Sequence, residues 1–122
     1  MQHRAIHPTG MSYSQAYEIS GYQRLVFVSG QVPEDENGKT PPDFRSQAEL
    51  AWKNVARQLQ ATDMGLQDIV KLTIYLSDRE YRQENIEVRR NVLGDHQPAM
   101  TIIITGIYDE QWLLEIEAIA AK

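Results

Sequence analysis

Hydrophobic positions in the middle of the chain recur at spacings of three and four, which predicts two amphipathic helices. The first is expected over residues 46–62, because Ser46 and Glu49 form a capping box and Gly65 is placed to end the helix in a left-handed conformation. The second is expected between Asp78, as its cap, and Gly94. The residues that recur on the two helices are Ala48, Trp52, Val55 and Leu59, then Tyr81, Asn85, Val88 and Val92.

Alternating polar and apolar positions predict the strands. Residues 70–76 alternate strictly, and further strands are expected over 101–107 and 113–120. Two shorter runs, 13–19 and 24–28, are expected to form a hairpin across a turn at 20–23 that contains a glycine. The order is then β-β-α-β-α-β-β, an α+β fold with one mixed sheet and two helices on one of its faces.

The sheet face away from the helices is expected to carry both polar or charged and apolar side chains. Lys71, Thr73 and Tyr75 share this face of one strand, and Glu115 and Glu117 share it in the last strand. Such a face is either solvated or an interface between subunits with polar pockets, and periodicity does not choose between them.

Composition narrows the class of protein. The 122 residues indicate a single domain over 1–122, with residues 1–10 as a flexible arm and 33–42 as a loop. Twelve basic against 17 acidic residues give a net charge of −5, which argues against nucleic acid as a partner. There is no cysteine, and no apolar run is long enough for a membrane span. We expect a cytoplasmic protein without membrane contact.

Glu115 and Glu117 are the most suggestive candidates for chemistry. Residues two apart in a strand point to the same side, so both carboxylates can line one pocket, where one could orient a water or act as a general base. The competing interpretation is an ion pair with Lys71 or with an arginine across the sheet.

Other polar groups give weaker signals. His3, His7 and His96 have no third ligand placed near them, so no metal site is expected. Arg89 and Arg90, with acidic residues nearby at positions 84 and 87, are expected on a solvated helix face held by salt bridges.

Several segments, in order and at matching spacing over residues 12–120, resemble the Rid family of enamine and imine deaminases. The most specific are Ser-Gly-Gln-Val-Pro at 29–33 and Glu-Ile-Glu-Ala-Ile-Ala at 115–120. Supporting segments are Tyr-Ser-Gln-Ala at 13–16, the strand at 68–76, Asn85, and Pro-Ala at 98–99. The chain is therefore identified as similar to this family.

The resemblance implies a chorismate-mutase-like fold that assembles as a homotrimer, with a small-molecule cleft at each subunit boundary and no metal or organic cofactor. By position, it implies that Glu115 orients the attacking water as the catalytic residue. It also assigns the substrate-binding residues: Tyr13, Gly30, Asn85, and the backbone of Thr101 and Ile102.

The sequence departs from the family pattern at two places. Met11-Ser12 stands where Gly-Pro usually precedes the tyrosine, and Met100 stands where the deaminases have an arginine that binds the substrate carboxylate. A thioether cannot pair with a carboxylate, and losing a partly buried charge pair costs about 2–5 kcal/mol. We therefore expect a deaminase with altered substrate range, weak or inactive on acids of the 2-aminoacrylate type. The alternatives are a non-catalytic binding or regulatory module and, least favoured, the ribonuclease activity sometimes ascribed to the family.

Overall fold

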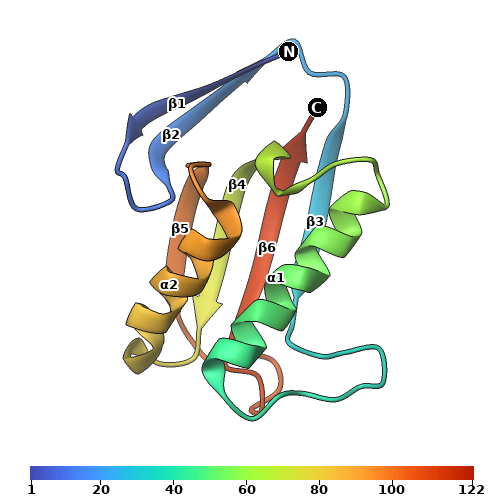
Figure 1. Ribbon diagram of the computed structural model, residues 1–122, viewed down its shortest axis with the longest axis vertical. Helices are drawn as coiled ribbons and strands as arrows, with labels where there is room; N and C mark the ends of the chain where they lie inside the picture. The colour runs from blue at the N-terminus through green and yellow to red at the C-terminus, as the bar shows by residue number, and fades with distance from the viewer.

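A mixed six-stranded sheet carries two helices on one face, as Figure 1 shows for the computed structural model, which describes all 122 residues. The strand order across the sheet is β1-β2-β5-β4-β6-β3. The α+β architecture expected from the sequence is therefore confirmed. The elements are β1 (Gln2–Pro8), β2 (Ser14–Ser20), β3 (Leu25–Gln31), α1 (Phe44–Gln60), β4 (Ile69–Leu76), α2 (Arg82–Leu93), β5 (Ala99–Ile104) and β6 (Leu114–Ala121), with 3-10 turns at Leu66–Asp68 and Arg79–Tyr81.

The hydrophobic core lies between α1 and the two central strands, β4 and β6. Every second residue is buried from Leu72 to Leu76 in β4 and from Leu114 to Ala120 in β6, so the predicted alternation is confirmed there. At the start of β4 the register is irregular, and Ile69 is buried in place of Val70. Trp52 and Leu59 of α1 pack onto this apolar layer and are nearly inaccessible to solvent. α2 packs beside α1 and lies over the side of the sheet that contains β5.

The helix ends differ in detail from the prediction. Asp43, rather than Ser46, caps α1, because its carboxylate accepts a hydrogen bond from the Ser46 N–H at 3.0 Å. Asp63, with φ of 59°, takes the left-handed conformation after α1 that was expected at Gly65. Asp78 and Gly94 bound the second helical segment as predicted, with Gly94 at φ of 58°.

The predicted hairpin between residues 13–19 and 24–28 is wrong. β2 pairs with β1 and touches β5 only at Ser14 and Ala99, whereas β3 pairs antiparallel with β6 on the other side of the sheet. The residues between β2 and β3 carry the chain across the end of the sheet, where Gln23 and Arg24 bond to Lys122. The partners of both strands come from distant parts of the sequence, so adjacency along the chain was misleading.

The first residues of the chain do not form the loop that was expected. Residues 2–8 form β1, which pairs with β2 from Gln2 opposite Ser20 to Pro8 opposite Ser14. The segment is too polar to show a strand pattern, and its conformation comes from this pairing. The pair extends beyond the rest of the sheet at one end (Figure 1).

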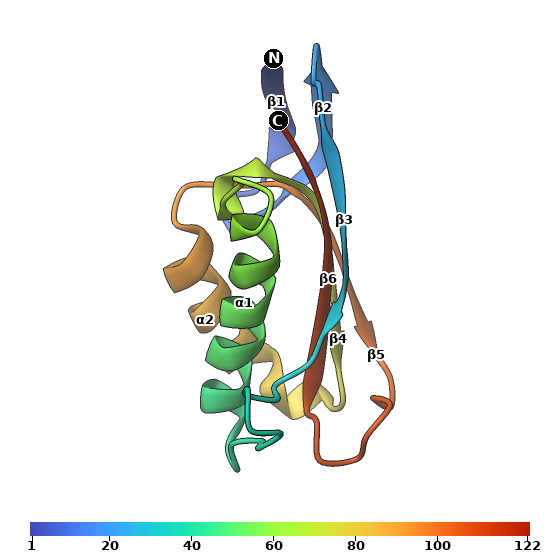
Figure 2. The ribbon, with the colours of Figure 1, turned by 90° about the vertical axis from the view of Figure 1, so that its right-hand side faces the viewer.

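The face of the sheet opposite the helices is uncovered (Figure 2). It is polar around Thr73 and Glu117, but Phe27 is 71% exposed and Ile103 is 41% exposed. No helix is both long enough and apolar enough to cross a membrane.

Candidate functional site

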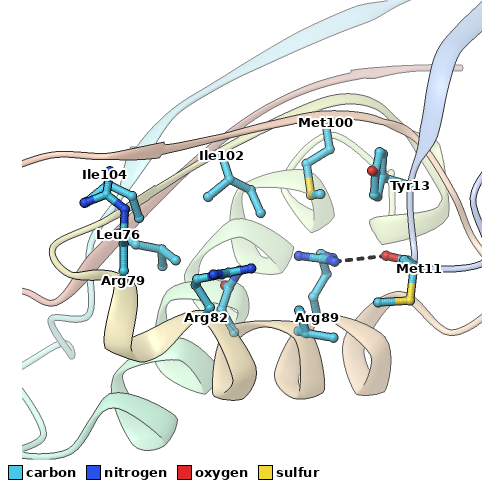
Figure 3. Close-up of a pocket in the computed structure, with 11 residues that line it drawn as sticks. Met11, Tyr13, Leu76, Arg79, Arg82, Arg89, Met100, Ile102 and Ile104 are labelled. Carbon is cyan, nitrogen blue, oxygen red and sulfur yellow. Dashed lines mark hydrogen bonds between the residues drawn. The ribbon is translucent and has the colours of Figure 1, made fainter.

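A pocket of about 520 Å³ lies between α2 and β5, a size that suits a small metabolite (Figure 3). It is lined by Met11, Tyr13, Leu76, Arg79, Arg82, Asn85, Ile86, Arg89, Met100, Ile102 and Ile104. Four of the residues expected to bind substrate, Tyr13, Asn85, Met100 and Ile102, are thus together in one chain.

The turn between β1 and β2 places Tyr13 at the pocket. The Gly10 N–H donates to Oε1 of Gln97 at 2.7 Å, and Ser14 Oγ donates to the Gln97 carbonyl at 2.6 Å. Ser12 is buried with φ of 63°, a conformation that a non-glycine residue adopts only where its surroundings impose it. The turn is therefore held tightly against the segment that leads into β5.

Asn85 and Met100 face each other across the pocket from α2 and β5. The even-numbered residues of β5 point to the helix side, which brings the Met100 side chain into the pocket, where the resemblance led us to look for an arginine. Asn85 is 1% exposed, and neither its amide nitrogen nor its amide oxygen has a partner. A buried amide without partners is costly, so this group is available to a ligand.

Arg89 contradicts the expectation of a solvated, salt-bridged face. It is 2% exposed, and the acidic residues that were expected to pair with it, Glu84 and Glu87, bind Arg45 of α1 instead. Only Arg90 is on the solvent side as predicted. A sequence signal for Arg89 existed: it lies four residues after Asn85, which puts both side chains on the same face of a helix.

Glu115 lies on the other side of the sheet, against Gly30. A methyl group added at Gly30 would come within 1.8 Å of Oε2 of Glu115. The register of β3 against β6 shifts between Val28 and Gln31, so Gly30 stands at a bulge beside the carboxylate. Partial burial, and secondarily the charge of Glu117, raise the pKa of Glu115 above its ordinary value of 4.5.

Glu117 does not form the ion pair considered from the sequence. It accepts a hydrogen bond from the Tyr75 hydroxyl, and this bond raises the pKa of Tyr75. Lys71 instead donates to the Thr101 Oγ1 at 2.7 Å. Glu115 thus keeps its carboxylate free of any cation on the uncovered face.

Thr101 and Ile102 lie at a free edge of the sheet. β2 meets β5 only at Ala99, so the outer side of β5 beyond that residue has no neighbouring strand. Both residues are exposed. The backbone at this edge is therefore accessible to a ligand or to a strand of another chain.

The histidines are not gathered at either site. His3 and His96 flank Tyr17, with ring centroids 5.4 and 5.8 Å from that of the tyrosine. No group of three or more His, Asp or Glu side chains suited to a metal ion is present.

The family model for endoribonuclease L-PSP matches residues 3–122. The chain belongs to this family, the Rid family. A RutC family protein of Pyrococcus abyssi is 32% identical over 112 residues, covering 90% of this chain and 86% of the relative. TdcF of Escherichia coli, which carries the provisional name reactive intermediate deaminase, is 31% identical over 102 residues and 80% of this chain, with 79% of its own length covered.

Solved structures agree with the Rid assignment. The structure of Escherichia coli TdcF with bound serine has a TM-score of 0.76 at 30% identity and covers 98% of this Rid chain and 94% of its own. A Rid family protein from Yersinia pestis, 22% identical and fully covered in both directions, has a TM-score of 0.86 and shows the same fold.

Within one Rid chain, the expected site residues fall into two groups. Tyr13, Asn85, Met100 and Ile102 line the pocket at α2, whereas Gly30, Thr101 and Glu115 lie on the uncovered face or at its edge. One chain alone therefore does not bring the carboxylate of Glu115 to the pocket that contains Tyr13.

Proposed function

We propose that this Rid protein hydrolyses small imines or enamines to a carbonyl compound and ammonia, at sites completed between the subunits of a homotrimer. The observation that carries the proposal is Glu115. It is a partly buried carboxylate with a raised pKa, seated against a glycine bulge and free of any cation. A general base works best when its pKa approaches the working pH.

The reaction needs one proton acceptor and one water. Glu115 takes a proton from water as the oxygen forms a bond to the imine carbon, and the C=N bond becomes a C–N single bond. Return of this proton to nitrogen gives a carbinolamine. Glu115 then carries the hydroxyl proton of the carbinolamine to the nitrogen, the C=O double bond forms as the C–N bond breaks, and the nitrogen leaves with the electron pair as ammonia. An enamine first moves one N–H proton to its β carbon and so becomes the imine. Tyr13 and Asn85 hold the substrate, and the open β5 backbone at Thr101 and Ile102 supplies further donors.

Assembly is proposed to unite the two groups of residues. The uncovered sheet face has exposed apolar residues, Phe27 and Ile103, beside the polar pockets around Glu115 and Glu117. β5 offers a free edge next to the pocket. If another subunit packs on this surface, Glu115 of one chain can face the Tyr13 pocket of the next.

Met100 alters the substrate range in this proposal. The wall of β5 that carries an arginine in the deaminases is here lined by Met100, Ile102 and Ile104. Acids of the 2-aminoacrylate type, bound in the family manner, are therefore turned over weakly or not at all.

The test is ammonia release from a panel of freshly generated imines and enamines, measured for the wild type and for Glu115→Gln. We expect release from at least one substrate and its loss in the variant by about 100-fold or more. Glu110→Gln, a change of the same type at an exposed position, is the matched control and should be fully active. Equal activity of Glu115→Gln and the wild type would refute the role of Glu115.

Met100 also favours a second candidate, a non-catalytic binding module of the same family. In that case the panel gives no ammonia from any substrate, while a ligand of the pocket still raises Tm.

A further inference from the structure

Arg89 has more hydrogen-bonding capacity than the protein uses. Its Nη2 donates to the Met11 carbonyl at 2.9 Å, but Nε and Nη1 have no partner although the residue is 2% exposed. The unpaired donors are the single N–H of Nε and both N–H groups of Nη1. Such donors in a buried position are unfavourable unless something binds them.

The charge of Arg89 is also uncompensated. No acidic side chain lines the pocket, and the four ion pairs of the structure involve only Arg4, Arg45 and Arg57. Arg79 and Arg82 add two further cations at the same pocket. In a chain with net charge −5, this is a local concentration of positive charge without a counter-ion.

Figure 3 shows the guanidinium group of Arg89 extending from α2 toward Met100 and the pocket interior. Met100 occupies the family position for the carboxylate-binding arginine, on the opposite wall. The molecule therefore lacks a guanidinium on the β5 wall and has an unpaired one on the facing α2 wall.

We propose that Arg89, supported by Arg82, forms an anion subsite on α2, and that the pocket binds small carboxylic acids with the acid group against this helix. The planar fork of a guanidinium fits a carboxylate in a bidentate manner through Nη2 together with either Nε or Nη1. Met11 takes one of the two N–H groups of Nη2, so the other N–H and the unpaired nitrogen beside it leave one edge of the fork open. The amide group of Asn85, unpaired on the same helix face, is available to the polar part of the acid. This inference rests on the proposed function in taking the pocket as the substrate site.

Relocation of the cation changes which acids fit. An acid whose carboxylate binds at α2 has that group on the opposite side of the pocket from the β5 wall. If the C=N bond adjoins the carboxylate, that bond also lies near α2, away from the position that it has in the family substrates. Acids that carry the reacting carbon at some distance from the carboxylate are expected to bind better.

The experiment measures binding, not turnover. Pyruvate and 4-oxopentanoate serve as stable carbonyl acids, and their methyl esters serve as uncharged controls, each titrated against the wild type by calorimetry and thermal shift. We expect 4-oxopentanoate to bind more tightly than pyruvate, and neither ester to bind measurably. Arg89→Met should weaken binding of the acid at least about 30-fold, the low end of what is lost when one partner of a buried charge pair is truncated.

Arg90→Met is the matched control, because it removes the same charge from the next residue of the helix, outside the pocket, and should leave acid binding within about twofold of the wild type. Arg89→Lys keeps the charge without the fork, so it tests the proposal even if the Met variant folds poorly, and should bind at an intermediate strength. Absence of binding by both acids, equal binding of acid and ester, or unchanged binding in the Arg89 variants would overturn the subsite. Acid binding that depends on Arg89, without ammonia release from any imine, would sink the proposed function and leave the subsite standing.

Discussion

Gly30 and Glu115 are in such close contact that no side chain fits between them. A Cβ at position 30 would lie 1.8 Å from Oε2 and 2.7 Å from Cδ of the glutamate. The backbone of Gly30 has ordinary geometry, so the glycine serves the carboxylate rather than a strained turn. The bulge in β3 brings the backbone to this position, and bulges are frequent next to active sites.

Gly30→Ala should therefore affect activity far more than folding. The carboxylate is the movable end of a side chain and can swing aside, so the free energy of unfolding should change by less than about 1 kcal/mol. Ammonia release should fall by about 100-fold, because the base leaves its position. Gly106→Ala is the control, since a Cβ there meets nothing within 4 Å. Full activity of Gly30→Ala would show that the placement of Glu115 is unimportant.

The pH profile should report the charge of Glu117. Glu115 must be ionised to accept a proton, so activity falls on the acid side as pH drops through its pKa, which burial and Glu117 hold above 4.5. Glu117→Gln removes the neighbouring negative charge and leaves the burial. The acid limb of kcat/KM should therefore move to lower pH, while in Glu110→Gln it should stay in place. A limb that moves to higher pH in Glu117→Gln would contradict this assignment.

Moving the guanidinium back to β5 should restore family-type chemistry only if Arg89 is removed. Met100→Arg alone adds another cation, opposite Arg89, to a pocket that already has three arginines and no acidic residue, so we expect a lower Tm and little gain. Met100→Arg combined with Arg89→Met leaves the number of cations at the pocket unchanged and should hydrolyse 2-aminoacrylate at least about 30-fold faster than the wild type. A full gain from Met100→Arg alone would show that the two positions do not compete.

The sequence predicted the elements with strong periodicity. β4, β6 and α1 have regular apolar positions, and the structure buries those positions. β1 could not be predicted in this way, because Gln2–Pro8 is polar and becomes a strand only by pairing with β2. The same cause explains why the hairpin prediction was wrong. β2 pairs with β1 and β3 pairs with β6, and these pairings form only when the whole sheet assembles.

The resemblance named individual candidate residues for the site, but it did not predict how one chain arranges them. The resemblance gave Tyr13, Asn85 and Glu115, whereas their location on two sides of one sheet depends on strand order. Arg89 was missed because acidic neighbours in sequence suggested surface pairing. Those neighbours turn toward Arg45 of α1, which the sequence of α2 alone does not reveal.

The central claim is that each working site combines Glu115 from one subunit with the Tyr13 and Asn85 pocket of another. Two variants that are each expected to be inactive, Glu115→Gln and Asn85→Ala, can test it together. The pair is to be co-expressed with different affinity tags, purified as mixed oligomers, and compared with each variant alone in the same ammonia assay.

A mixed homotrimer contains two subunits of one variant and one of the other. Only one of its neighbouring pairs has an intact pocket facing an intact Glu115, which is about one third of the sites. The account predicts that the purified mixed oligomers regain about one third of wild-type ammonia release. Mixed oligomers as inactive as the single variants, next to an active wild type, would contradict it.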